Sequence, residues 1–143
     1  MQPTSDQFTE KAWSSILSAQ NQAQNSFHQY LQTEHLLLSL LENDELAIKI
    51  IEKGNGEVTK VKSLLNGFIR DQPTLSSKPD SVFIGKSLNK VLDKANKRKD
   101  DLGDKFISIE HLLIGLASDE RCCKDILSKV NLEENNLNSI IME

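Results

Sequence analysis

The hexapeptide TEHLLL, at residues 33–38, recurs as IEHLLI at residues 109–114, and this recurrence decides how the rest of the chain is interpreted. Around the two hexapeptides, residues 31–65 align with residues 107–141 without a gap. The identical pairs are Glu34/Glu110, His35/His111, Leu36/Leu112, Leu37/Leu113, Leu40/Leu116, Ile50/Ile126, Lys53/Lys129, Asn55/Asn131, Glu57/Glu133 and Ser63/Ser139. A match at constant spacing over a whole segment is typical of a duplicated structural unit. The sequence therefore predicts two copies of one unit.

The apolar residues recur with the period of an α-helix. Near the N-terminus, Phe8, Ala12, Ile16, Ala19 and Ala23 form one stripe, and similar stripes follow in both copies of the repeat. Four short helices alone would leave their apolar faces exposed, so the copies are expected to pack on each other about a pseudo-twofold axis. The predicted fold is all-α: a compact bundle of about eight helices, made of two pseudo-twofold related four-helix repeats.

The chain is expected to form a single domain over residues 1–143. Repeat one spans about residues 6–70 and repeat two about residues 82–143. The segment between them, at about 71–81, contains prolines and small polar residues. Such a composition is typical of a linker that passes over the surface.

Composition excludes several classes of protein. The 143 residues carry a net charge of −4, which argues against a module held to nucleic acid by bulk electrostatics. A basic stripe at 86–99 is followed by acidic residues and lacks interleaved aromatic residues, so it predicts a solvated helix face. No apolar run approaches the roughly 20 residues that span a bilayer, and the first residues lack the features of a signal peptide. We therefore expect a cytoplasmic protein without a nucleic-acid or membrane partner.

The two cysteines, Cys122 and Cys123, are adjacent, which suits a reducing compartment better than a disulfide framework. In the repeat alignment they fall on Leu46 and Ala47, inside an apolar stripe. They are interpreted as small, buried core residues rather than catalytic nucleophiles. His28, in the polar run between the first two helices, is interpreted as a surface residue.

Two patterns resemble sites of chemistry without meeting its requirements. The sequence IGKS at residues 84–87 resembles the end of a phosphate-binding loop, but Asp80 stands where that loop requires glycine. The pairs Glu34-His35 and Glu110-His111 suggest a metal site across the pseudo-axis. Each pair also opens a predicted helix, where a carboxylate is favoured by the helix dipole. We therefore predict no catalytic residue, no metal site and no cofactor in this chain.

Three segments carry a resemblance to a known family. They are FTEKA at 8–12, TEHLLL at 33–38 and GDKFISIEHLL at 103–113. In order and spacing they resemble the Clp N-terminal repeat domain, over essentially the whole chain. The stretch from residue 103 to residue 121 is more similar to the ClpB type, a disaggregase, than to the ClpC or ClpA type, which are unfoldases that feed a protease.

The resemblance implies a mobile, non-enzymatic domain of a hexameric ATPase that acts as a chaperone in the stress response. Such a domain engages unfolded or aggregated polypeptides and passes them to the ATPase ring. Its implied partners are those polypeptides, the ATPase modules of the hexamer and, through the full-length protein, a DnaK-type co-chaperone. ATP and magnesium are expected only in the ATPase modules, and the isolated domain is expected to be monomeric.

The resemblance also implies candidate site residues. In ClpB relatives, residues matching Thr9, Asp104 and Glu110 are associated with substrate engagement. The neighbouring Phe8 and Phe106 are expected to supply apolar contact area. The alternative is a ClpC-type domain that binds adaptors or phosphoarginine-tagged proteins, for which the resemblance implies Glu34 and Glu110 as carboxylates that recognise guanidinium groups. Thr9, Asp104 and Glu110 are equally consistent with capping and turn residues.

Overall fold

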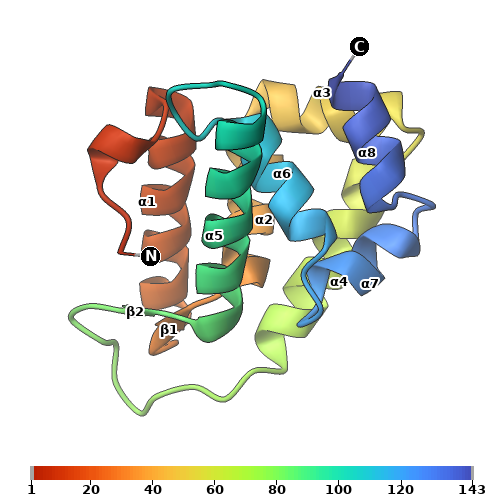
Figure 1. Ribbon diagram of the computed structural model, residues 1–143. Helices are drawn as coiled ribbons and strands as arrows, with labels where there is room; N and C mark the ends of the chain where they lie inside the picture. Colours follow the sequence, from red (N-terminus) through yellow and green to blue (C-terminus); the bar gives the residue numbers. More distant parts are fainter. Residues whose placement is uncertain (1, 143) are drawn as a thin grey trace.

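The computed structural model describes residues 2–142 and is built from helices almost throughout (Figure 1). A short 3-10 helix, Ser5–Gln7, precedes the first α-helix, and two-residue strands lie before α2 and α5. The elements are α1 (Glu10–Asn25), β1 (Tyr30–Leu31), α2 (Thr33–Asn43), α3 (Glu45–Lys53), α4 (Val58–Arg70), β2 (Phe83–Ile84), α5 (Lys86–Asp101), α6 (Ile109–Ala117), α7 (Cys123–Ser128) and α8 (Glu134–Ile141). This architecture confirms the predicted bundle of eight helices in two four-helix repeats.

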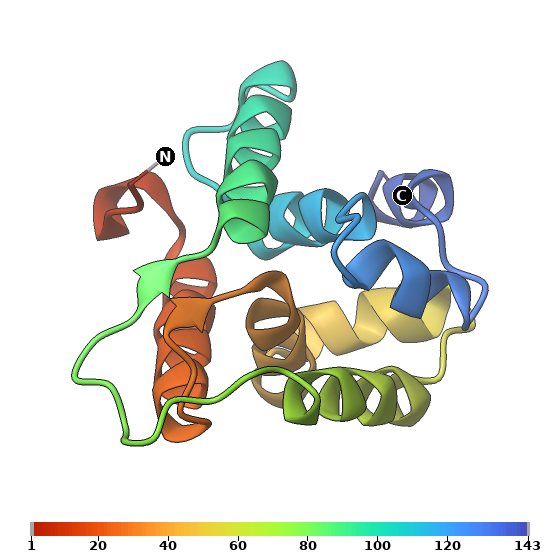
Figure 2. The same cartoon turned by 90° about the horizontal axis from the view of Figure 1, so that it is seen from below.

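Helices α2 and α6 form the centre of the bundle. Figure 2 shows α1–α4 in the lower part of the view and α5–α8 in the upper part, with α2 and α6 between their neighbours. Helix α2 contacts α1, α3 and α4 of its own repeat and also α6, and α6 contacts α5, α7 and α8. The leucines of both central helices are buried, which explains why leucines recur at matching positions in the two hexapeptides.

The repeated histidine stabilises the start of each central helix. The Gln32 N–H donates to Nδ1 of His35 over 2.9 Å, and the Ser108 N–H donates to Nδ1 of His111 over 2.8 Å. In both cases the side chain at the third helical position reaches back to the backbone before the helix, as in a capping box. At each Glu-His pair, the sequence predicted that the carboxylate is favoured at the start of the helix. In the structure, the imidazole accepts the hydrogen bond from the backbone.

Two backbone bridges join the repeats and reveal the pseudo-twofold axis. Phe8 forms a parallel bridge with Ile107, and Ile84 of β2 pairs in parallel with Leu31 of β1. The repeat alignment carries Leu31 onto Ile107, and the same spacing extends to the N-terminal residues, because α1 and α5 begin and end at matching positions. This extended alignment carries Phe8 onto Ile84. Each bridge is therefore the symmetry equivalent of the other, with the contribution of the two repeats exchanged.

Two expectations about burial need correction. His28 is buried rather than on the surface, because its ring packs against His35 with ring centroids 5.2 Å apart. Cys122 and Cys123 are buried as expected, but Leu46, which aligns with Cys122, is 41% exposed. The repeats therefore differ locally at this position. Among residues 2–142, no helix combines the length and hydropathy needed to cross a membrane.

Candidate functional site

The predicted substrate-binding residues gather where α1 and α6 begin. Thr9 caps α1, with its Oγ1 accepting from the Ala12 N–H over 3.2 Å. The Thr9 N–H donates to the Ile107 carbonyl oxygen over 3.0 Å, which ties the start of α1 to the segment that leads into α6. Asp104, Phe106 and Glu110 belong to this segment or to the first turn of α6. The structure therefore brings one end of α1 next to the predicted residues of the second repeat.

The Asp104 side chain is exposed to solvent and also contacts His111. One carboxylate oxygen lies 2.9 Å from Nε2 of His111, and its side chain is 52% exposed. Because His111 Nδ1 accepts from the Ser108 backbone, the ring proton is on Nε2, which donates a hydrogen bond to Asp104. The Ser108 hydroxyl donates to Glu110 over 3.4 Å. We call Thr9, Asp104 and Glu110 the polar rim, whose role in binding stays a prediction.

Phe8 does not supply the contact area expected of it. Its side chain is 5% exposed and packs on Trp13, with ring centroids 5.6 Å apart. The bridge to Ile107 holds Phe8 between the repeats, so its ring joins the core. Phe106 is 48% exposed and remains available as an apolar contact beside the polar rim.

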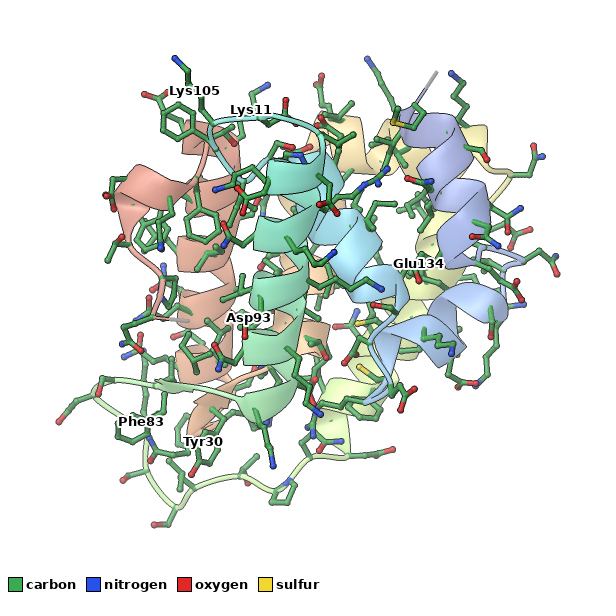
Figure 3. All side chains as sticks on the ribbon, in the orientation of Figure 1. Lys11, Tyr30, Phe83, Asp93, Lys105 and Glu134 are labelled. Atoms are coloured by element: carbon green, nitrogen blue, oxygen red, sulfur yellow. The ribbon has the colours of Figure 1, made fainter. Side chains whose placement is uncertain are left out.

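A groove runs between α1 and the start of α5. It has a volume of about 740 Å³ and is lined by Trp13, Ile16 and Gln20 of α1, by both strands and by Lys86. At one end lie Tyr30 and Phe83, whose rings are 51% and 60% exposed with centroids 6.3 Å apart. Figure 3 shows this pair at the opposite end of the molecule from Lys11 and Lys105, which mark the end with the polar rim.

Sequence reasoning missed the Tyr30–Phe83 pair, although the repeat contained a signal for it. The alignment of the two copies places Tyr30 on Phe106. Both residues precede a central helix and both are about half exposed. Applying the repeat to the predicted site would therefore have identified Tyr30. Phe83 aligns with Gln7, so only the strand pairing in the structure brings it to Tyr30.

The alternative guanidinium site is already filled from within the chain. Glu34 is fully buried, and Arg121 binds it through Nε over 2.9 Å and Nη2 over 3.0 Å. The Arg121 guanidinium also donates to Gln72 and lies over the Phe68 ring, 5.4 Å from its centroid. The hydrogen bond to Glu34 raises the pKa of Arg121 above its ordinary value. The expectation that Glu34 recognises an external guanidinium group conflicts with this pairing.

The two Glu-His pairs have separate partners and do not converge. His35 Nε2 lies 3.0 Å from Nδ1 of His28, and the repeat alignment carries this contact onto that of His111 with Asp104. Burial lowers the pKa of His35 to about 4 and also lowers the pKa of His28. Both rings are therefore neutral near pH 7, and His35 donates to His28 because its Nδ1 already accepts from Gln32.

A family model described as the Clp repeat (R) N-terminal domain matches residues 7–130. The match covers most of the chain, and the chain belongs to this family. It is 50% identical over 141 residues, which is 99% of the chain, to the chaperone protein ClpB 1 of Parasynechococcus marenigrum. It is 51% identical over 122 residues, or 85% of the chain, to the chaperone protein ClpB of Prochlorococcus marinus.

The chain spans 16% and 14% of the length of these two relatives. Among solved structures, the N-terminal domain of Hsp104 from Candida albicans superposes with a TM-score of 0.84 at 23% identity, covering 95% of this chain and 89% of that one. A ClpV N-domain in complex with a VipB peptide superposes with a TM-score of 0.74 at 15% identity, covering 92% and 82%. These two structures show the shared fold.

Proposed function

We propose that this chain is the substrate-binding, non-catalytic N-terminal domain of a ClpB-type ATP-dependent protein disaggregase. It engages unfolded or aggregated polypeptides and passes them to the ATPase ring of a hexamer. Family membership and the two ClpB relatives support the assignment to this type. The polypeptides, the ATPase modules and a DnaK-type co-chaperone acting through the full-length protein are its proposed partners, in the cytoplasm.

The exposed Tyr30–Phe83 pair at the end of the groove is the observation that carries this proposal. Exposed apolar area of this kind is typical of a binding surface, and unfolded chains expose apolar side chains that folded proteins bury. The polar rim lies outside the groove, at the opposite end of the molecule, where it and Phe106 offer a second set of polar and apolar groups to a polypeptide. A ClpV N-domain has been solved with a peptide, which is consistent with peptide binding on this fold.

Binding is expected to be weak. An open groove must select exposed apolar segments and still release them to the motor. Dissociation constants near 100 µM, about −5 to −6 kcal/mol, suit that role. The ClpC-type alternative is not favoured, because the two relatives named above are ClpB proteins and because Arg121 already occupies Glu34.

The test is a titration of fluorescently labelled, permanently unfolded casein with the chain. The variant Tyr30→Ser with Phe83→Ser should weaken binding at least about tenfold, since aromatic anchors dominate the energy of small interfaces. Leu46→Ser is the matched control, because Leu46 is an exposed apolar residue on α3, outside the groove. Equal affinity for the aromatic double variant and the unmodified chain would contradict the proposal.

A further inference from the structure

A cluster of buried sulfur and oxygen atoms lies where α7 begins, away from the groove. It consists of Asp119, Cys122 and Cys123, whose exposed fractions are 5%, 4% and 0%. Their potential ligand atoms all lie within 4.8 Å of one another. We propose that this thiol–carboxylate cluster binds one thiophilic divalent cation, of the kind represented by Zn²⁺ and Cd²⁺.

The distances within the cluster match those of a tetrahedral site. Cys122 Sγ lies 3.7 Å from Cys123 Sγ and 3.7 Å from Asp119 Oδ2. In a tetrahedral zinc site, with Zn–S near 2.3 Å and Zn–O near 2.1 Å, two sulfurs are about 3.8 Å apart and a sulfur and an oxygen about 3.6 Å. Both separations are therefore close to those between the ligands of a tetrahedral zinc site.

The carboxylate is held in place by other groups, as in established metal sites. Asp119 Oδ2 accepts from the Cys122 and Cys123 N–H groups over 3.1 Å and 3.0 Å, and from the Thr33 hydroxyl over 2.8 Å. These hydrogen bonds fix the orientation of the carboxylate, and an ion that binds Oδ2 takes the place of one of these three donors. A fourth potential ligand atom is close, since Glu34 Oε1 lies 3.8 Å from Cys122 Sγ.

The charge balance favours a divalent ion. Without an ion, the cluster carries two thiols and one carboxylate, a net charge of −1. Binding forms two metal–sulfur bonds and releases both thiol protons to solvent, so that two thiolates, one carboxylate and one divalent cation again sum to −1. The buried charge is unchanged, and Arg121 remains paired with Glu34. Thiolate ligands select zinc and cadmium over magnesium and calcium.

The first repeat indicates that the fold itself does not require these ligands. The repeat alignment places Asp119, Cys122 and Cys123 on Asn43, Leu46 and Ala47. In the first repeat, Asp44 caps the corresponding helix by accepting from the Ala47 N–H over 2.9 Å. A helix start of this kind therefore forms without cysteine, and the sulfur atoms of the second repeat are available for another role.

The test uses the reduced chain, refolded from urea in the presence of Cd²⁺ so that burial does not block entry. We expect one ion per chain, a thiolate-to-cadmium charge-transfer absorption in the ultraviolet, and release of two protons measured by calorimetry in buffers of different ionisation enthalpy. Zn²⁺ should displace Cd²⁺ and abolish the absorption. Failure to observe the absorption after refolding would overturn the proposal.

Variants separate this site from adventitious binding. Cys122→Ser with Cys123→Ala should abolish the absorption, and Asp119→Asn, which keeps a capping oxygen, should weaken binding at least about tenfold. Asp125→Asn is the control, because Asp125 is an exposed carboxylate in the same helix that pairs with Lys129 over 3.3 Å. Stoichiometric binding that persists in the double cysteine variant would show that the ion binds elsewhere and would overturn the assignment.

Discussion

At the scale of single residues, the ion pair between Arg121 and Glu34 links the two repeats through one buried carboxylate. Glu34 has no exposed surface, and both of its oxygens accept from the same guanidinium group. A buried carboxylate is costly unless it is paired, and such a bidentate pair supplies charge and hydrogen bonds together. The guanidinium therefore stabilises a carboxylate that the core already encloses.

Removing the guanidinium group should be strongly destabilising. We expect Arg121→Met to lower the free energy of unfolding by about 3 kcal/mol, because it leaves Glu34 buried and unpaired. Adding Glu34→Gln to this variant should recover part of the loss. Lys97→Met removes only an exposed pair with Asp101 and should cost under about 0.5 kcal/mol. Urea unfolding measures all three, and a loss from Arg121→Met no larger than that of the control would contradict this account.

The neutral His28–His35 pair should make stability depend on pH. The pKa of His35 is about 4 in the folded chain and 6.5 when unperturbed, so the unfolded state binds more protons between these values. The contribution of His35 to the free energy of unfolding is therefore fully present above pH 6.5. It falls by about 3 kcal/mol as the pH drops towards 4. Urea midpoints between pH 7 and pH 4 measure the effect. His35→Gln should flatten the profile in this range, and an unchanged profile would exclude His35 as its source.

At the scale of secondary structure, α5 and α6 approach closely at a glycine. A Cβ added at Gly115 would lie 2.9 Å from the Val91 carbonyl oxygen and 3.1 Å from its Cγ1. In the alignment Gly115 falls on Ser39 of α2. The second repeat therefore uses a smaller residue at the equivalent point of its central helix, where a neighbouring backbone is in contact.

Alanine at Gly115 should destabilise the chain even though alanine favours helices. We expect Gly115→Ala to cost about 1 to 3 kcal/mol, because the Val91 backbone must shift. Gly67→Ala in α4 is the matched control, since its added Cβ would meet only the Arg70 side chain at 3.8 Å. That control should gain about 0.5 to 1 kcal/mol from helix propensity. Thermal unfolding measures both, and a stabilising Gly115→Ala would show that the helices separate at little cost.

At the scale of the whole molecule, the pseudo-twofold axis produces two related ends. The end with Thr9, Asp104 and Phe106 corresponds to the end with Gly85, His28 and Tyr30. The first end has an exposed carboxylate beside its aromatic residue, whereas the second has a buried neutral histidine. The ends therefore differ in charge, although the backbone bridges that form them are equivalent.

The polar rim should contribute to binding more than to stability. Asp104→Ala with Glu110→Ala is expected to lower the affinity for unfolded casein, and losing these polar contacts should cost about 1 kcal/mol of stability. NMR titration should place chemical-shift changes around the starts of α1 and α6 as well as around Tyr30 and Phe83. Unchanged affinity in the double variant, or changes confined to the turn at Gly54, would contradict the assignment of the rim.

The sequence by itself determined the helices, their grouping into two copies and the burial of the copies against each other. These follow from the spacing of apolar residues and from a duplication, both of which are visible along a single chain. The repeat also located Cys122 and Cys123 in the interior. The division at about residues 71–81 and the binding role of the rim stay predictions.

Only the tertiary structure decided which polar groups meet. Arg121 and Glu34 come from different repeats, and so do Asp119 and Thr33, so neither contact has a signature in local spacing. His28 becomes a core residue because His35 lies beside it, and Phe8 becomes one because Ile107 bridges it. Periodicity indicates which face of a helix is apolar, but a buried charge or ring depends on a partner supplied by the packing of separate elements.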